Sequence, residues 1–456
     1  MNSKEKYRME CDRIQASPAW KRETAARMEQ PCRRPRKTRW ALTGALAAVL
    51  VCVLVFSPLL KPATVTVEAK ENLMQGISAQ KQDIPKKPAS EFVSAQADFS
   101  VKLFQKTASA DKDSLVSPVS AALALGMAAN GAKGETLSQF EALLGGGMDL
   151  PALNKNFASE QNALKSVTSG KLLLANSIWY RTQNLSVSKS FLQSNADFFG
   201  AGAFGLDFAD PASVGKINSW VSKNTDGNIT KMVEKINPSD RMFLFNALYL
   251  QQDWEYAYNG SGKGTFHAPG GDRTVPMMTS TEKYLHDGKS EGILKPLKDS
   301  HYTFAAILPE SGTKLNDYIQ GMTGNGFLNL MRSAGEETAI GTLPKFKFDC
   351  TLNLSKTLES LGLSDAFDGS KADFSAMGSS ADGNLYVSSV TQKTFIQADE
   401  LGLKAGAVTE LACDATCAME KPRTIDFDRP FIIAVVDTST DLPLFLGVVA
   451  NPVAAG

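Results

Sequence analysis

This sequence has few histidines and no net charge, and each absence excludes a class of function. The 48 basic and 48 acidic residues cancel, so no strong field points to nucleic acid or another highly charged partner. The three histidines are His267, His286 and His301, and no two of them have the helical spacing of a metal site. The sequence therefore predicts no metal, no cofactor and no nucleic-acid partner.

Motifs of nucleophilic and phosphate chemistry are also missing. No Gly-x-Ser-x-Gly elbow occurs anywhere in the chain. The stretch from Gly260 to Thr265 is rich in glycine, but it lacks the Gly-Lys-Ser/Thr ending and the upstream glycine of a phosphate-binding loop. We interpret it as a surface turn between two strands, and we do not expect the chain to be an enzyme.

Cysteines are few and do not form a framework. The six are Cys11, Cys32, Cys52, Cys350, Cys413 and Cys417. None shows the paired spacing of zinc ligands. Only the last two are near neighbours, and in an oxidising compartment they could pair. Two free thiols are the equally good alternative.

Long apolar runs are rare, and the one that stands out lies near the N-terminus. Residues 1–40 are polar and end in a basic cluster, and 41–60 carry no charge at all. About 20 apolar residues span a bilayer, and a positive flank stays on the cytoplasmic side. We therefore predict a basic cytoplasmic leader, 1–40, and a transmembrane signal-anchor, 41–60, with the remainder extracellular. A cleaved signal peptide and secretion are the alternative.

Residues 61–90 contain Lys61-Pro62, Pro85-Lys-Lys-Pro88 and many polar side chains, which predicts a flexible stalk with little core. From residue 91 to 456 the pattern is globular. Helical spacing runs from Phe92 to Lys106, and Ser117-Pro118 is a helix-start signal. Strand patterns cover Leu172 to Tyr180 and Phe243 to Leu250.

The stretch from Glu400 to Met419 has an unusual alternation. Every second residue from Leu403 to Ala415 is apolar or small, and every charge in that part lies on the other set. This period of two is typical of a half-buried strand, yet the glycines and alanines are poor strand formers. The pattern suits an ordinary edge strand, and equally a segment that becomes a strand only when it slides beneath a packed surface.

Two runs that follow this stretch resemble the C-terminal signature of the serpins: Phe427 to Asp437, with Arg429-Pro-Phe431, and Leu444 to Pro452. Further motifs appear in the family's order. They are Ser117-Pro-Val-Ser120, Gly131-Ala-Lys-Gly-Glu-Thr136, Ile217-Asn-Ser-Trp-Val221, Asn246-Ala-Leu-Tyr249 with Trp254, Leu343-Pro-Lys-Phe346 and Ala372-Asp-Phe-Ser375. The resemblance runs from about residue 92 to 452. One departure is Asp113, where the family usually has Asn.

The resemblance implies an α+β fold, a single domain of three β-sheets and about nine helices with an exposed reactive-centre loop. It implies an irreversible suicide-substrate inhibitor of serine proteases, with cysteine proteases also open. The protease would cleave the loop, which would then insert into the main sheet. We expect a monomer, and the anchor and sparse cysteines suit a bacterial-type, membrane-anchored member.

Three groups of residues receive roles from this resemblance. Glu400, Gly402 and Leu403 would form the hinge with Ala405, Gly406, Ala407, Val408 and Thr409, although the family prefers Thr or Ser at position 403. Ser117, Ser120, Asn246 and Gln392 would form the shutter beneath the main sheet, with Gln392 in place of the usual histidine. Trp254 would mark the breach where insertion begins, and a simple core tryptophan is the alternative.

The reactive bond is placed by counting. Hinge spacing gives Thr416–Cys417, whereas counting back from Arg429 gives Met419. The segment from Ala412 to Met419 contains no Arg or Lys, which favours elastase-like or subtilisin-like proteases over trypsin-like ones. Leu403 and a Cys413–Cys417 bridge would instead suit a non-inhibitory serpin, a binding or chaperone-like module.

Overall fold

The computed structural model describes residues 71–452, apart from 166–168, 239, 299–300 and 404–422. The predicted leader, the predicted anchor and the first part of the predicted stalk lie outside this range. Within the described residues, no helix combines the length and apolar character needed to cross a membrane.

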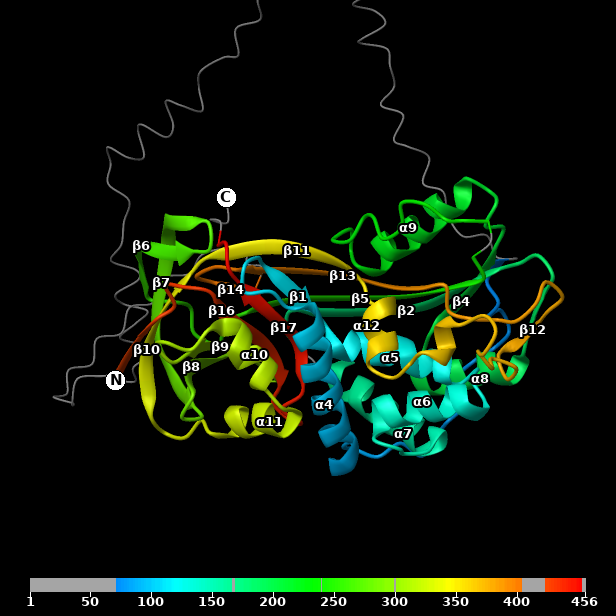
Figure 1. Ribbon diagram of the computed structural model, residues 1–456, viewed down its shortest axis with the longest axis horizontal. Coiled ribbons are helices and arrows are strands. Elements are labelled where there is room, and N and C mark those ends of the chain that lie inside the picture. The colour runs from blue at the N-terminus through cyan, green and yellow to red at the C-terminus, as the bar shows by residue number, and fades with distance from the viewer. Residues whose placement is uncertain (1–70, 166–168, 239, 299–300, 404–422, 453–456) are drawn as a thin grey trace, which may run out of the picture. The chain divides into compact units, whose positions relative to one another are not determined.

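The helices pack mainly on one side of the long strands (Figure 1). Helix α5 begins at Pro118, as the helix-start signal predicts, and all twelve of its residues are buried. The described α-helices are α4 (Ser90–Thr107), α5 (Pro118–Ala129), α6 (Gly134–Gly145), α7 (Leu150–Lys165), α8 (Lys189–Phe199), α9 (Ala212–Asn224), α10 (Leu315–Gly321), α11 (Gly324–Arg332) and α12 (Ser355–Ser360), with a 3-10 turn at Asp365–Phe367.

One sheet, called the main sheet below, contains the segments that matter for the site. Its order is β11 (Phe346–Asn353), β13 (Ser389–Ala398), β14 (Gly402–Leu403), β5 (Met242–Asp253), β2 (Lys171–Arg181) and β4 (Gly202–Leu206). Helix α9 lies on one face and α5 on the other (Figure 1). The main sheet is therefore enclosed between helices in its middle.

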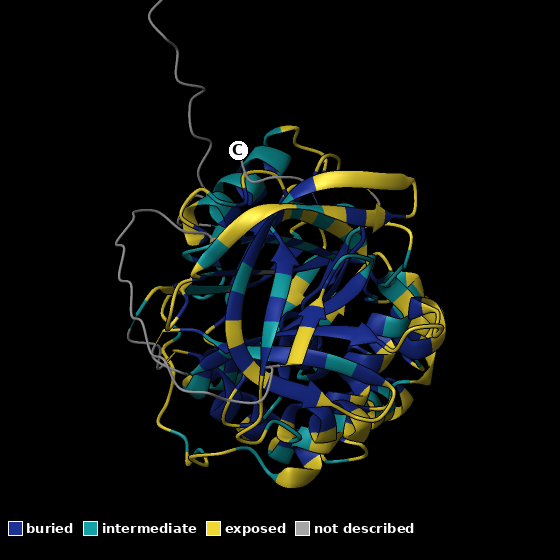
Figure 2. Cartoon of the chain, turned by 90° about the vertical axis from the view of Figure 1, so that its left-hand side faces the viewer, coloured by how far each residue is buried: buried dark blue, intermediate teal, exposed yellow. Residues whose placement is uncertain are grey.

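A second sheet forms the other half of the core. Its order is β1 (Ser114–Val116), β17 (Pro443–Val449), β16 (Phe431–Asp437), β9 (Tyr302–Pro309), β8 (Ser290–Pro296), β7 (Gly271–His286), β10 (Thr338–Pro344) and β15 (Arg423–Asp426), with β6 (Gly260–Ala268) also paired to β7. Every residue of β16 and β17 is buried, as expected for apolar strands inside a core. Figure 2 shows the buried residues concentrated in the central strands. A two-stranded sheet joins β12 (Gly378–Ser380) to β3 (Leu185–Val187), so the expected α+β fold of three sheets is confirmed.

The interpretation of Gly260 to Thr265 as a turn is wrong, because these residues begin strand β6, which pairs with β7 along its length. Glycine is a poor strand former, but here it gives room for a neighbour. A Cβ on Gly264 would lie 2.8 Å from the Met277 side chain. The strand is largely exposed, so polar and small residues are tolerated on its open face.

The part of the predicted stalk that the structure describes does not stand apart from the domain. Residues 71–89 pack on the domain: Leu73 N donates to Ala203 O at 2.9 Å, and Gln80 N donates to Asp197 Oδ1 at 2.8 Å. Ala89 N donates to the Asn156 side chain at 2.7 Å. The backbone N–H groups of this segment therefore find their acceptors on the domain, which its polar composition did not predict.

Candidate functional site

The main sheet is closed at one end and split at the other. Strands β13 and β5 pair directly and in parallel from Ser389–Phe243 to Lys393–Ala247. Beyond these pairs β14 lies between them, with Leu403 opposite Ala398 on one side and Gln252 on the other. The two residues of strand β14 thus already occupy a position in the sheet.

The two ends of the sheet share one register. Ser389 and Phe243 differ by 146 in residue number, and so do Ala398 and Gln252, the two residues that face Leu403. A strand that extended β14 would therefore pair with both neighbours without any change in the register between β5 and β13. This matters because side chains alternate faces along a strand, and a slip of one residue would reverse them.

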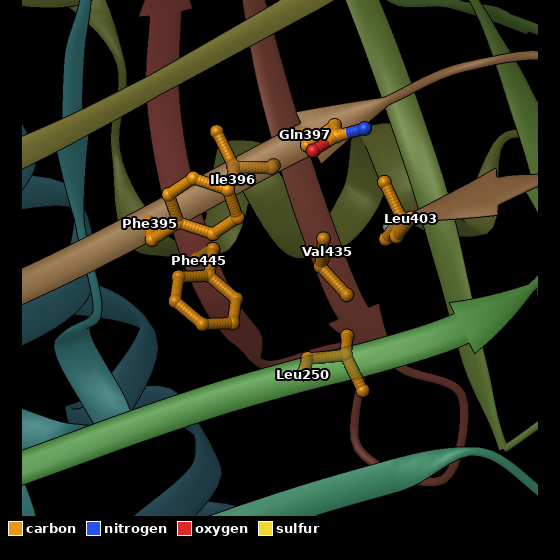
Figure 3. Close-up of a pocket in the computed structure, with 7 residues that line it drawn as sticks. All are labelled: Leu250, Phe395, Ile396, Gln397, Leu403, Val435 and Phe445. Carbon is orange, nitrogen blue, oxygen red and sulfur yellow. The ribbon is translucent and has the colours of Figure 1, made fainter. Parts of the chain in front are cut away.

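A small cavity lies next to Leu403. It is lined by Leu250, Phe395, Ile396, Gln397, Leu403, Val435 and Phe445, and it is about the size of one water molecule (Figure 3). Leu403 itself is 3% exposed. The leucine side chain, which is larger than the Thr or Ser that the family prefers at this position, is therefore already buried beneath the sheet before any further residue enters.

The residues just before β14 are held by a row of three hydrogen bonds. Trp254 Nε1 donates to Asp399 O at 2.8 Å. Tyr258 N donates to Glu400 O at 2.9 Å, and Trp254 N donates to Leu401 O at 3.0 Å. Trp254 is buried, so it is a core residue and an anchor for this segment at once. We call the side chains of Trp254 and Tyr258 the hinge platform.

Glu400 makes a further contact that the sequence analysis did not assign. Its carboxylate forms an ion pair with Lys345, which directly follows β10. Partial burial raises the pKa of Glu400, but the hydrogen bond and charge of Lys345, together with a backbone hydrogen bond, lower the pKa overall. The Leu343-Pro-Lys-Phe346 motif contained this lysine, and only the fold brings it to residue 400.

The predicted shutter residues converge where β13 and β5 meet. Gln392 Oε1 accepts from Ser117 N, and Gln392 Nε2 donates to Ser117 O, each at 2.8 Å. Asn246 is opposite Gln392 in the ladder, and Ser120 is buried one turn further along α5. The orientation of the Asn246 amide lies outside the described part of the structure. The bonds of Gln392 go to the backbone of Ser117 rather than to its hydroxyl.

Two further polar contacts in this region escaped sequence analysis. Thr394 Oγ1 donates to Leu115 O at 3.0 Å and ties β13 to β1. The carboxylate of Asp113 accepts from Ala450 N and Asn451 N, each at 2.8 Å. In sequence Thr394 looked like an ordinary polar position, and Asp113 was only a departure from the family's usual Asn, because the partners of both residues are distant along the chain.

Several predicted residues lie outside the described range. They are the hinge residues Ala405, Gly406, Ala407, Val408 and Thr409, the reactive-bond candidates Thr416, Cys417 and Met419, and the neighbouring Cys413. Their roles stay predictions. Among the residues that are described, no group of three or more His, Cys, Asp or Glu side chains could hold a metal ion.

Comparison with known proteins agrees with this geometry. The model of the family described as "Serpin (serine protease inhibitor)" matches residues 94–452. An uncharacterised serpin-like protein of Thermococcus kodakarensis is 30% identical over 79% of this chain and 85% of its own length. The crystal structure of the thermophilic serpin tengpin in its native state is 41% identical, with a TM-score of 0.80, over 83% of this chain and 99% of that one.

The same thermophilic serpin in its latent state is also similar, at 39% identity, with a TM-score of 0.72, over 82% of this chain and 100% of that one. The native state therefore superposes better on this chain than the latent state does. Members of the matched family are protease inhibitors rather than enzymes, and their general targets are serine proteases. The extent of the family match and the identity of these relatives leave one assignment: this chain belongs to the serpin family.

Proposed function

We propose that this chain inhibits serine proteases irreversibly, by offering the stretch from Glu400 to Met419 as a reactive-centre loop that is cleaved and then enters the main sheet. The observation that carries the proposal is β14, which starts a strand between β13 and β5 in the register of both. Cleavage would free the segment that follows Leu403. Insertion before hydrolysis of the acyl-enzyme would trap the protease.

The register indicates where each inserted residue would go. Continuing it pairs position 405 with Leu250 and Ile396, and position 407 with Leu248 and Thr394. All four of these partners are buried. The alanines at positions 405 and 407 suit such surroundings, because small apolar groups need no polar partner there.

Insertion would exchange one set of backbone bonds for a larger one. The five parallel pairs from Ser389 to Lys393 would separate, and the new strand would pair on both of its edges. Each hydrogen bond gained contributes about 1 kcal/mol net, and the buried face of the loop adds burial of apolar surface. The uninserted form would then be a kinetically trapped state.

The position of Leu403 supports inhibition over a non-inhibitory binding or chaperone-like role. A large residue at the hinge would oppose insertion if the sheet had to expand to receive it. Here that side chain is buried in the intact chain. The strongest sequence argument for a non-inhibitory member therefore loses its physical basis.

For the target we propose an elastase-like or subtilisin-like protease. The residues around Thr416 are small and uncharged, which suits a shallow specificity pocket. The test is incubation of the full-length protein with elastase, subtilisin and trypsin, followed by denaturing electrophoresis and mass spectrometry of the released fragment. We expect a covalent complex with one of the first two. Loop cleavage by all three without any complex would refute inhibition and favour the non-inhibitory alternative.

We also propose that residues 41–60 tether the domain to a membrane with the inhibitor on the outer face. The support is the charge-free run and the basic cluster that precedes it. A tethered inhibitor would act on proteases that approach the surface of the cell that makes it.

A further inference from the structure

A buried ion pair lies directly behind the hinge platform. Lys295, in β8, is 1% exposed, and its ammonium pairs with the carboxylate of Glu282 in β7, which is 9% exposed. Ser280 Oγ donates to Glu282 Oε1 at 2.7 Å, and the ammonium also lies 3.3 Å from that hydroxyl. A lysine in the otherwise apolar run from Ile293 to Leu297 is an unusual choice for a core strand.

The ammonium faces the two rings of the platform. It lies 4.2 Å from the centroid of the Tyr258 ring and 5.6 Å from that of Trp254. Both distances are within the range of cation–π attraction, which is strongest when the cation is shielded from water. The two rings also meet edge to face, with centroids 5.7 Å apart.

The Tyr258 hydroxyl does not orient its own ring. It is buried and has no hydrogen-bond partner among the described residues. A buried tyrosine usually fixes its ring through that hydroxyl. At Tyr258 the face of the ring rests on the ammonium instead, so the cation and the edge of Trp254 determine its orientation.

Stability alone does not account for the pair. Replacing a buried ion pair with apolar side chains of similar volume is often neutral or stabilising, because the desolvation cost of two charges disappears. The charges instead orient the two rings, since a cation attracts the face of an aromatic ring and an apolar side chain does not. Of the two platform side chains, the Trp254 indole donates to Asp399 O, while the backbone N–H groups of Tyr258 and Trp254 donate to the next two carbonyls, Glu400 O and Leu401 O.

We infer that Lys295 is a positioning residue for loop insertion, acting through Trp254 and Tyr258 to fix the point at which the inserted strand begins. Glu282 neutralises the ammonium and holds it beneath the rings. This inference rests on the proposed inhibitory function. Its direct consequence, a firmly held hinge in the intact chain, can be measured without any protease.

The test compares the wild-type full-length protein with two double variants. Glu282→Leu with Lys295→Met removes both charges and keeps similar volume. Glu282→Asp with Lys295→Arg keeps both charges, and one side chain shortens as the other lengthens. Amide hydrogen exchange at Trp254 and Tyr258 reports on the bonds to the hinge carbonyls, and thermal unfolding confirms that each variant is folded.

We expect the charge-free variant to melt at or above the wild-type temperature while these two amides exchange at least about tenfold faster. The charge-keeping variant should exchange like the wild type. Equal exchange in the wild type and the charge-free variant would overturn the inference. Faster exchange in both double variants would also overturn it, since packing rather than charge would then hold the platform.

A second readout links the platform to inhibition. In the charge-free variant, the number of inhibitor molecules cleaved for each protease trapped should rise several-fold, because the inserting strand starts from a less fixed point. An unchanged ratio would overturn the positioning role. If the wild type traps no protease, the proposed function fails, while the exchange measurement still tests Lys295 on its own.

Discussion

Gln392 and Ser117 exchange two hydrogen bonds of 2.8 Å, one in each direction, between the side chain of a main-sheet strand and the backbone that starts helix α5. Gln392 is 3% exposed and Ser117 is fully buried. Glutamine satisfies a donor and an acceptor with one amide, and it does not titrate. The closed end of the main sheet is therefore joined to the core by a contact that is insensitive to pH.

Truncation of this contact should destabilise the intact protein. In Gln392→Ala, the Ser117 N–H loses its partner inside the core, while the Ser117 carbonyl keeps its bond from Ala121 N, so the change should cost about 2–3 kcal/mol of unfolding free energy. Lys347→Ala, at an exposed position of the neighbouring strand β11, is the control and should cost less than about 1 kcal/mol. Urea unfolding of both variants measures the difference, and equal losses would contradict the role given to Gln392.

Position 407 tests the direction in which the loop faces. Ala407→Arg would bring a charge to a buried position on insertion, at a cost of several kcal/mol, whereas Glu410→Arg would leave its charge on the outward face. We expect the first variant to be cleaved normally but to trap little protease, and the second to behave like the wild type. The measurement is the ratio of trapped complex to cleaved inhibitor. Identical ratios in the two variants would refute the inward face assigned to Ala407.

Cleavage within residues 412–419 should make the domain more stable. Insertion would add about ten ladder hydrogen bonds of about 1 kcal/mol each, so the thermal midpoint should rise by more than about 10 °C. Calorimetry of the intact and the nicked protein measures this shift. A nicked form that melts no higher than the intact one would exclude an insertable loop.

Glu160 predicts a loss of stability as the pH rises from about 4.5 to about 8. Its side chain is buried in α7, and burial, with a smaller contribution from the charge of Asp437, raises its pKa from 4.5 to about 8. The folded state holds this proton more tightly than the unfolded state does. The stabilisation is therefore complete below about pH 4.5 and is lost as the pH rises to about 8.

Glu160→Gln keeps a neutral side chain at every pH, so its unfolding free energy should exceed that of the wild type at pH 8.5 by on the order of 2–4 kcal/mol. The difference should shrink towards pH 5. Glu135→Gln, an exposed change on α6, is the control and should follow the wild type at both values. Parallel pH profiles for Glu160→Gln and the wild type would contradict the buried neutral carboxyl.

The predicted anchor can be tested in intact cells. External protease should remove the domain while residues 1–40 stay protected inside. Antibodies against each part, with lysed cells as the control, measure which fragments survive. A mature protein that begins after about residue 60 would instead mean that a signal peptide is cleaved.

Sequence reasoning predicted the fold, because its motifs are local and occur in a fixed order. The structure places Trp254 and Glu400 at the split in the main sheet and Ser117 and Gln392 at its closed end, and the roles predicted for them stay predictions. What sequence reasoning missed depends on contacts between distant segments. Lys345 follows a strand of the second sheet, and only the fold brings it to Glu400. In the sequence Lys295 is a single charge within an apolar strand, and its contacts with Glu282 and the two rings appear only in the fold.

For two polar segments, the sequence predicted too little regular structure. Residues 71–89 and the glycine-rich start of β6 were expected to be irregular from their composition. Both are ordered because a neighbour supplies what the segment lacks: Asp197 and Asn156 accept from the first, and β7 pairs with the second. The composition of a segment gives its own donors, acceptors and side chains, but it does not give the hydrogen-bond partners that distant segments provide.

The common register of β5, β13 and β14 also sets a rule for how the loop can change length. Deleting or adding one residue between Leu403 and Ala415 would send the charged set beneath the sheet, whereas a change of two residues would keep the faces and move only the cleavage point. Beyond the cleavage point no such parity would apply, since in the proposed mechanism that part would stay outside the inserted strand. Variation among natural relatives should therefore come in even steps before the bond and in any step after it, so alignments of loop lengths alone could locate the reactive bond.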